Sequence, residues 1–212
     1  MTSLRSLELP LHEYPTDKVT RGLLRYYDPI FAPWVGKPIS LLELGIHCGG
    51  SLSLWRDYFP LGTIVGIDSK VQDFELGERI YTFEGKQEDR GFLSRVANEV
   101  APDGFDIIID DCSHVGWMSK QAFWHLFDNH LKPDGLYVIE DWGTGYLDDW
   151  TDGKRPDAQK YSTSGPEFQS HNYGMVGLIK QLIDKLITRT EFDHMVISPC
   201  VVFIRKIEAS AR

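Results

Sequence analysis

The sequence is short of the features that mark secreted, zinc-binding and membrane proteins. It has three cysteines, Cys48, Cys112 and Cys200, and they are far apart. They form neither a zinc-site spacing nor a disulfide framework, so we expect a reducing, cytoplasmic location. No uninterrupted apolar run approaches the roughly 20 residues that a membrane-spanning helix needs. We expect no secretion signal either, because Met1 to Pro10 lack a long apolar core.

Positive charge is also scarce. The chain has 22 lysines and arginines against 31 aspartates and glutamates, which gives a net charge of −9. This balance argues against a nucleic-acid-binding protein held by phosphate contacts. Its 42% hydrophobic and 25% charged residues are ordinary for a globular protein, and 212 residues can form one domain. We therefore expect a small-molecule partner, without membrane contact, and leave a homo-oligomer open.

Short apolar segments alternate with amphipathic segments along most of the chain. We expect strands at residues 39–45, 63–68 and 80–84, from residue 105, and at residues 136–142, 192–197 and 200–205. We expect helices between them at residues 52–58, 91–100, 118–130 and 173–188, and a turn at residues 131–135. This alternation predicts a doubly wound, mostly parallel, seven-stranded α/β sheet of the Rossmann-like kind. The last two strands are expected to form an antiparallel hairpin.

Two regions lie outside this alternation. Residues 1–38 are expected to form an N-terminal arm and helical cap on a main domain of residues 39–212. Thr16 or Asp17 can cap a helix in this region, and Lys18, near the start of that helix, is expected to be a surface lysine. Residues 143–173 are rich in glycine, aspartate, serine, threonine and proline. Because loops of about 30 residues are unusual in compact domains, we predict a lid or a ligand-binding insertion there.

A glycine-rich turn follows the first expected strand, with the sequence E-L-G-I-H-C-G-G-S from Glu43 to Ser51. Glycine lets a backbone approach a ligand closely, and nucleotide-binding turns lie between a strand and a helix. Asp68 ends the next strand, 23 residues after Gly45, where a carboxylate can accept both ribose hydroxyls. The glycines do not spell G-x-G-x-x-G. An acid at Glu43 repels pyrophosphate but suits a ligand with ammonium and sulfonium charges, which disfavours a dinucleotide-dependent oxidoreductase.

Two neighbouring strands are expected to end in acidic residues. One segment has the sequence F-D-I-I-I-D-D-C-S-H, and the strand after the next helix ends in E-D-W. Since a strand, a helix and a strand form a right-handed parallel unit, both ends fall at the carboxyl edge, where such sheets bind ligands. We expect the chemistry of the protein where four residues converge, namely Asp111, His114, Glu140 and Asp141. Carboxylate oxygens suit Mg2+, and no cysteine or histidine cluster suits zinc.

The glycine turn resembles the first motif of the class I S-adenosylmethionine-dependent methyltransferases, which has the form E-x-G-x-x-x-G-G-S. The resemblance covers roughly residues 39–206 and includes the terminal hairpin. It implies that residues 39–212 are the cofactor-binding domain. The cofactor-binding residues that it implies are Glu43, Gly45, His47, Gly49, Ser51, Asp68, Gln87, Asp89 and Asp110.

The D-D-x-S-H segment, with L-K-P-x-G-L-Y-V-I-E-D downstream, is more specific. It resembles the sugar O-methyltransferases of macrolide biosynthesis, a group that includes the mycinamicin and tylosin enzymes. The resemblance implies that Asp111, Glu140 and Asp141 bind Mg2+ and that His114 is the catalytic base beside Asp111. It implies methyl transfer from S-adenosylmethionine to a hydroxyl of a glycoside or another natural product. Cys112 departs from the group, which usually has glycine there.

A metal and a base suit this reaction together. Taking water at about 15.7 and histidine at about 6.5, proton transfer from a hydroxyl to histidine is uphill by roughly 12 kcal/mol. A metal bound to the hydroxyl lowers its pKa, and the nearby base then removes the proton.

Other interpretations stay open at this point. A catechol-like diol could chelate the same Mg2+, which would change the acceptor. The chain could also be a non-catalytic domain that binds S-adenosylmethionine. Asp111 and Glu140 could instead cap helices or form surface ion pairs, and His114 could be an ordinary turn residue.

Overall fold

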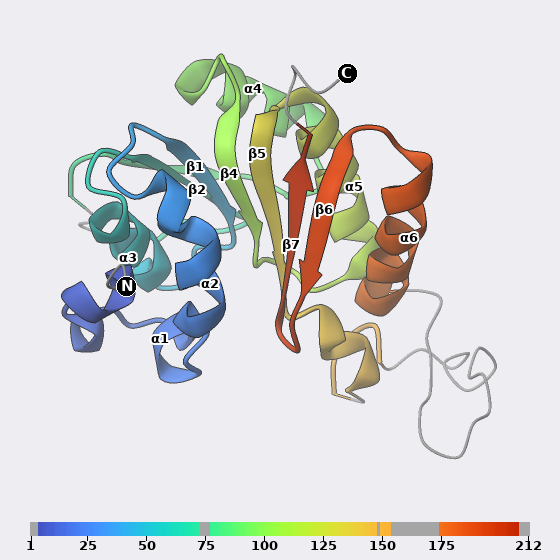
Figure 1. The fold of residues 1–212 in the computed structure, drawn as a ribbon, viewed down its shortest axis with the longest axis horizontal. Helices are drawn as coiled ribbons and strands as arrows, with labels where there is room; N and C mark the ends of the chain where they lie inside the picture. Colours follow the sequence, from blue (N-terminus) through green and yellow to red (C-terminus); the bar gives the residue numbers. More distant parts are fainter. Residues whose placement is uncertain (1–3, 73–76, 148, 154–173, 208–212) are drawn as a thin grey trace.

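The structure, a computed structural model, describes residues 4–72, 77–147, 149–153 and 174–207. A seven-stranded sheet runs through the molecule with helices on both sides (Figure 1). The strands are β1 (Ser40–Leu44), β2 (Thr63–Asp68), β3 (Ile80–Glu84), β4 (Phe105–Asp110), β5 (Leu131–Glu140), β6 (Phe192–Ile197) and β7 (Val201–Lys206). Their order is β3-β2-β1-β4-β5-β7-β6, and β7 is antiparallel to both of its neighbours. The predicted doubly wound sheet with an antiparallel hairpin is confirmed.

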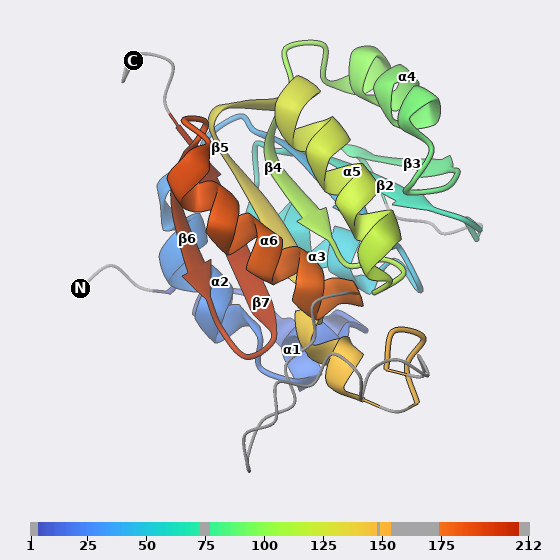
Figure 2. The same ribbon diagram turned by 90° about the vertical axis from the view of Figure 1, so that its right-hand side faces the viewer.

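Helices cover the two faces of the sheet as separate layers. One layer holds α4 (Arg90–Val100), α5 (Gly116–Asn129) and α6 (Gly174–Thr188), and Figure 2 views the molecule from the side of α5 and α6. The other layer holds α1 (Asp17–Thr20), α2 (Leu24–Phe31) and α3 (Gly50–Tyr58). Short 3-10 helices are η1 (Arg5–Glu8), η2 (Leu11–Glu13), η3 (Ala32–Trp34) and η4 (Trp142–Tyr146). Of the helices in the described ranges, none combines the length and the apolar character that crossing a bilayer requires.

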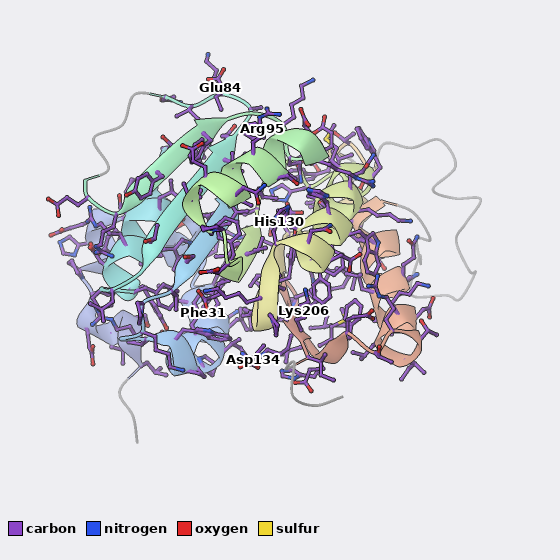
Figure 3. All side chains as sticks on the ribbon, turned by 90° about the horizontal axis from the view of Figure 1, so that it is seen from above. Phe31, Glu84, Arg95, His130, Asp134 and Lys206 are labelled. Atoms are coloured by element: carbon purple, nitrogen blue, oxygen red, sulfur yellow. The ribbon has the colours of Figure 1, made fainter. Side chains whose placement is uncertain are left out.

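The alternation of side chains along each strand divides the core between these layers. In β1, Leu44 packs towards α4, α5 and α6, whereas Leu41 packs towards the N-terminal helices. The N-terminal layer contains many aromatic rings, including Tyr27 and Phe31, whose centroids are 4.9 Å apart (Phe31 is labelled in Figure 3). Residues two apart share one face of a strand. Glu43 therefore lies on the same face as Leu41, towards the N-terminal layer.

The N-terminal helix begins where the sequence predicts. Thr16 is extended, with φ −139° and ψ 146°, and its side chain accepts a hydrogen bond from the Lys18 backbone amide at 3.3 Å. This is the geometry of an N-cap, in which a side-chain oxygen satisfies an amide that the helix leaves free. The cap fixes the direction of α1 and with it the side chains that α1 presents to the sheet.

The turn predicted at residues 131–135 is wrong, because these residues form the first part of β5. Phe105 pairs with Leu131 and Ile107 pairs with Leu136, so the register shifts within this segment. A Pro-Asp-Gly sequence favours a turn when it is considered locally. A bulge can absorb the same residues while the strand pairs on both of its sides.

The far end of β5 is also shorter than predicted. The strand ends at Glu140, and Trp142 begins η4 instead of extending the strand. Between them Asp141 has a φ of 49°, a left-handed conformation that is incompatible with extended chain. The reversal turns Asp141 away from the strand direction and leaves it at the edge of the sheet.

One aspartate joins the starts of two helices. Asp152 is 1% exposed, and its Oδ2 accepts hydrogen bonds from the Gly116 amide at 2.9 Å and the Met175 amide at 2.8 Å. A carboxylate at a helix N-terminus satisfies free amides and interacts favourably with the helix dipole. Asp152 thus caps α5 and α6 together. The predicted insertion at residues 143–173 falls partly on this segment, and its residues 154–173 lie outside the described residues.

Candidate functional site

A cavity of about 1000 Å³ opens at the carboxyl edge of the sheet. Small-molecule sites typically measure roughly 300–1,000 Å³, so the cavity can hold a sizeable ligand. Its wall is built by the segment around α1, the glycine turn, the ends of β2 and β3, and the segment after β4. Asp141 and Trp150 also line it. The two sequence regions singled out for chemistry therefore face one common space.

The glycine turn lines the cavity and packs tightly against the chain that follows β4. Gly45 has a φ of 98°, and a Cβ on it would lie 2.1 Å from the carbonyl oxygen of Asp111. Only glycine fits such a close approach in this conformation. Asp68 accepts hydrogen bonds from the Ile46 amide at 2.8 Å and the His47 amide at 3.2 Å. Partial burial raises the pKa of Asp68, but backbone hydrogen bonds outweigh burial and hold it below its usual value.

The predicted cofactor residues divide into two sets. Those that line the cavity are Gly45, His47, Ser51, Asp68 and Gln87. Those that do not line it are Glu43, Gly49, Asp89 and Asp110. Asp89 is the N-cap of α4, where it accepts from the Phe92 amide, and Asp110 accepts from the Gln87 side chain at 3.2 Å. Cofactor contact by any of these residues stays a prediction.

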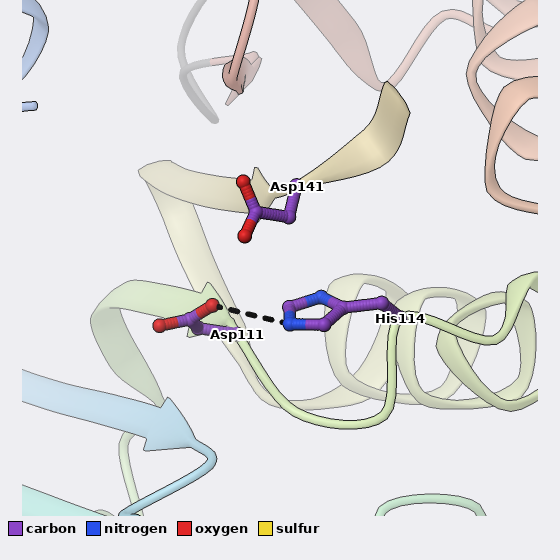
Figure 4. A group of neighbouring side chains, drawn as sticks. All are labelled: Asp111, His114 and Asp141. Atoms are coloured by element: carbon purple, nitrogen blue, oxygen red, sulfur yellow. Dashed lines mark ion pairs between the residues drawn. The ribbon is translucent and has the colours of Figure 1, made fainter. Parts of the chain in front are cut away.

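Three predicted site residues form an open cluster, which we call the outer group. Asp111, His114 and Asp141 offer ligand atoms that all lie within 4.8 Å of one another (Figure 4). Nε2 of His114 is 3.8 Å from Oδ1 of Asp111. The ring of His114 is also in edge contact with Trp150, at a centroid distance of 5.3 Å. The outer group lines the cavity, and its oxygen and nitrogen atoms could hold a divalent ion.

A second cluster lies directly beneath, and we call it the inner group. It consists of Glu43, Asp111 and Glu140, which again offer ligand atoms within 4.8 Å of one another. The ammonium of Lys18 lies among them, 3.1 Å from Glu43, 2.5 Å from Asp111 and 3.0 Å from Glu140. Lys18 is 1% exposed, so the expectation of a surface lysine is wrong.

The inner group is enclosed. Glu43 and Glu140 are 0% and 1% exposed, and the Tyr27 hydroxyl donates a hydrogen bond to Glu140. Burial raises the pKa of Glu140, and the charge of Asp111 adds to this effect. Burial also raises the pKa of Glu43, against the opposing charge of Lys18. Oε1 of Glu43 has no hydrogen-bond partner, although it lies near the ammonium. Three carboxylates share a single ammonium here, so the inner group could also attract a hard divalent ion nearby.

The predicted metal ligands are therefore distributed over both groups. Asp111 belongs to both, Asp141 belongs to the outer group, and Glu140 belongs to the inner group. Asp141 also forms a bidentate pair with Arg21, with Nη1 and Nη2 at 2.9 and 3.0 Å from its two oxygens. Metal binding by Asp111, Glu140 and Asp141 stays a prediction.

Arg21 was not predicted as a site residue, and Lys18 was predicted to be a surface lysine. A signal for Lys18 was present in the alternation of the strands, because Glu43, Asp111 and Glu140 follow Leu41, Ile109 and Val138 by two residues. All three apolar residues pack in the N-terminal layer. Three acids on one buried face require a cation from that layer.

Comparison with known proteins gives relatives of one kind. No protein-family model matches the chain. The 8-demethyl-8-(2-methoxy-alpha-L-rhamnosyl)-tetracenomycin-C 3'-O-methyltransferase of Streptomyces olivaceus is 39% identical over 176 residues, which cover 78% of this chain and 41% of that protein. The mycinamicin VI 2''-O-methyltransferase of Micromonospora griseorubida is 36% identical over 168 residues, which cover 76% of this chain and 38% of that protein. The chain thus spans about two fifths of the length of these relatives.

A solved structure shares the same architecture. The MycE methyltransferase of the mycinamycin biosynthetic pathway, in complex with Mg, SAH and mycinamycin VI, superposes with a TM-score of 0.73 at 31% sequence identity. The match covers 89% of this chain and 50% of that chain. The predicted Rossmann-like methyltransferase fold is confirmed.

Proposed function

We propose that this chain, which is homologous to O-methyltransferases of glycosylated natural products, transfers a methyl group from S-adenosylmethionine to a hydroxyl. The acceptor class that we propose is a glycoside or a related natural product, and the metal is Mg2+. The observation that carries the proposal is that one and the same cavity joins the glycine turn and Asp68 to the outer group. The relatives are more than twice as long as the matched region, so their substrates are proposals for this chain.

The cofactor end of the cavity would be built from the turn and the ends of β2 and β3. Asp68 would accept the two ribose hydroxyls, since its carboxylate is held in the charged form by backbone amides. Gly45 would let the nucleoside approach the backbone. Gln87, which lines the cavity and donates to Asp110, would border the base. The aspartate partner keeps this glutamine in a fixed orientation.

The acceptor end would be built from the acids and the histidine. Asp111 and Asp141 would hold Mg2+ together with Glu140, whose Oε1 contacts Lys18 and whose other oxygen would face the ion. Bound Mg2+ would lower the pKa of a coordinated hydroxyl. His114 would take the hydroxyl proton on Nε2, the nitrogen that faces Asp111 at 3.8 Å. The nearby carboxylate would stabilise the imidazolium that forms. Trp150 packs at the edge of the ring and would restrict its rotation.

Methyl transfer from labelled S-adenosylmethionine to a panel of glycosylated polyketides and catechols tests this function. We expect transfer to a glycoside, loss of transfer on chelation of the metal, and recovery on addition of Mg2+. His114→Ala should lower turnover by roughly 10²–10⁴-fold, the usual contribution of a general base, with unchanged affinity for S-adenosylhomocysteine. Unchanged turnover of this variant would remove His114 from the mechanism. Transfer only to catechols would change the acceptor class.

A further inference from the structure

Three strand tips point their acids at one position. Glu43 on β1 and Glu140 on β5 flank Asp111, which directly follows β4, and β1, β4 and β5 are adjacent in the sheet. The helix layer above this position supplies one cation, the ammonium of Lys18. The lysine reaches it from α1, which is fixed by the Thr16 cap. The position is therefore part of the fold and not a chance surface contact.

The distances at this position suit an ammonium but are close to those of a metal site. The ammonium nitrogen lies 2.5–3.1 Å from the three carboxylates. Divalent ions bind oxygen at about 2.0–2.1 Å for Mg2+ and about 2.3–2.6 Å for Ca2+. A modest inward shift of the side chains would thus convert an ammonium site into a divalent-ion site.

A divalent ion cannot join the ammonium at the inner position. Glu43, Asp111 and Glu140 surround this position, and the Lys18 ammonium contacts all three. The outer group offers Asp111, His114 and Asp141 to a divalent ion from solution. A second ion at the inner position would have to replace the lysine, because both cannot occupy the same space.

We propose that the Lys18 ammonium occupies the inner of two adjoining cation positions, so that the site takes one divalent ion from solution and not two. Lys18 is then a positioning residue for the proposed methyl transfer, on which this inference rests. Its contact with Oδ2 of Asp111 leaves Oδ1 facing His114. The lysine thereby directs the shared carboxylate towards the outer group.

Counting bound Mn2+ by electron paramagnetic resonance tests the proposal. The wild-type chain should bind one Mn2+. Lys18→Met keeps the packed stem but removes the ammonium, and it should bind two. Lys18→Arg keeps a positive charge and should bind one. Lys132→Met is the matched control, since Lys132 pairs with Asp106 at 2.8 Å away from the cavity, and it should bind one.

The outcomes separate this inference from the proposed function. One Mn2+ in both the wild type and Lys18→Met would overturn the inference and leave the proposed function intact. No Mn2+ in the wild type would overturn both. If Lys18→Met is unfolded without metal, Mn2+ should restore a cooperative thermal transition, as expected of a metal that replaces the missing cation. Failure to restore it at saturating Mn2+ would also overturn the inference.

Discussion

Asp141 cannot give the same two oxygens to a bidentate arginine and to a metal ion. Both oxygens accept hydrogen bonds from Arg21, at 2.9 and 3.0 Å. We predict that Arg21→Gln tightens the binding of Mn2+, because the ion no longer has to displace a guanidinium from Asp141. Loss of a nearby positive charge acts in the same direction.

The size of this effect follows from the exposure of the pair. The side chains of Arg21 and Asp141 are 41% and 17% exposed, so water screens their attraction. Arg21 also contacts Asp17 at 3.0 Å, and the displaced arginine would keep that partner. A pair of this kind contributes up to about 1 kcal/mol. The dissociation constant of Mn2+ should therefore fall by up to about fivefold in the variant, and by less at high salt.

Calorimetric titration of Mn2+ into the wild type and Arg21→Gln at two ionic strengths measures this change in affinity. Arg25→Gln is the matched control, because Arg25 lies in the same N-terminal layer and contacts the ring and hydroxyl of Tyr26. Its affinity for Mn2+ should equal that of the wild type. An Arg21→Gln chain that binds Mn2+ as weakly as the wild type, or more weakly, would refute the competition for Asp141.

Three further predictions concern the frame of the site. Asp152→Ala should lower the free energy of unfolding in urea by about 1–3 kcal/mol, because two buried helix amides lose their acceptor. Asp152→Asn should lower it by less. A urea midpoint of Asp152→Ala equal to that of the wild type would contradict the double cap. Burial lowers the pKa of His125 and His130, so the folded state disfavours their protonation. The contribution of these two histidines to stability should be constant above about pH 6.5 and fall below it, and replacing both histidines by glutamine should remove that fall from the urea profile. Gly45→Ala should weaken binding of S-adenosylhomocysteine at least roughly tenfold in calorimetry, whereas Gly143→Ala, where a Cβ meets no atom within 4 Å, should bind as the wild type does.

The sheet could be predicted from the sequence because its signals are local. The parallel strands β1, β3 and β4 are short runs each followed by a helix, and the spacing from Gly45 to Asp68 relates β1 to β2. The acids at residues 111 and 141 come directly after β4 and β5, so their meeting at one edge follows from the topology. These features depend on the order of the elements and not on details of packing.

The features that were predicted wrongly depend on contacts between distant parts of the chain. Lys18 is separated from Asp111 by 93 residues, and nothing in its own neighbourhood distinguishes it from a surface lysine. Its burial is a consequence of the acids opposite it. The turn predicted at the start of β5 was wrong for a related reason. The pairing of Leu131 with Phe105 overrides the local turn preference.

Asp152 holds the starts of α5 and α6 at one point of the fold. Asp152 and Gly174 lie in contact, since a Cβ on Gly174 would meet the Asp152 carboxylate at 2.4 Å. Asp152 and Gly174, which flank residues 153–173 in the sequence, therefore lie at one anchored point. Exchanging that stretch with the corresponding part of a relative leaves both anchor residues in place. Such an exchange tests whether residues 153–173 influence the choice of acceptor, while Asp152 keeps its contacts to the two helix starts.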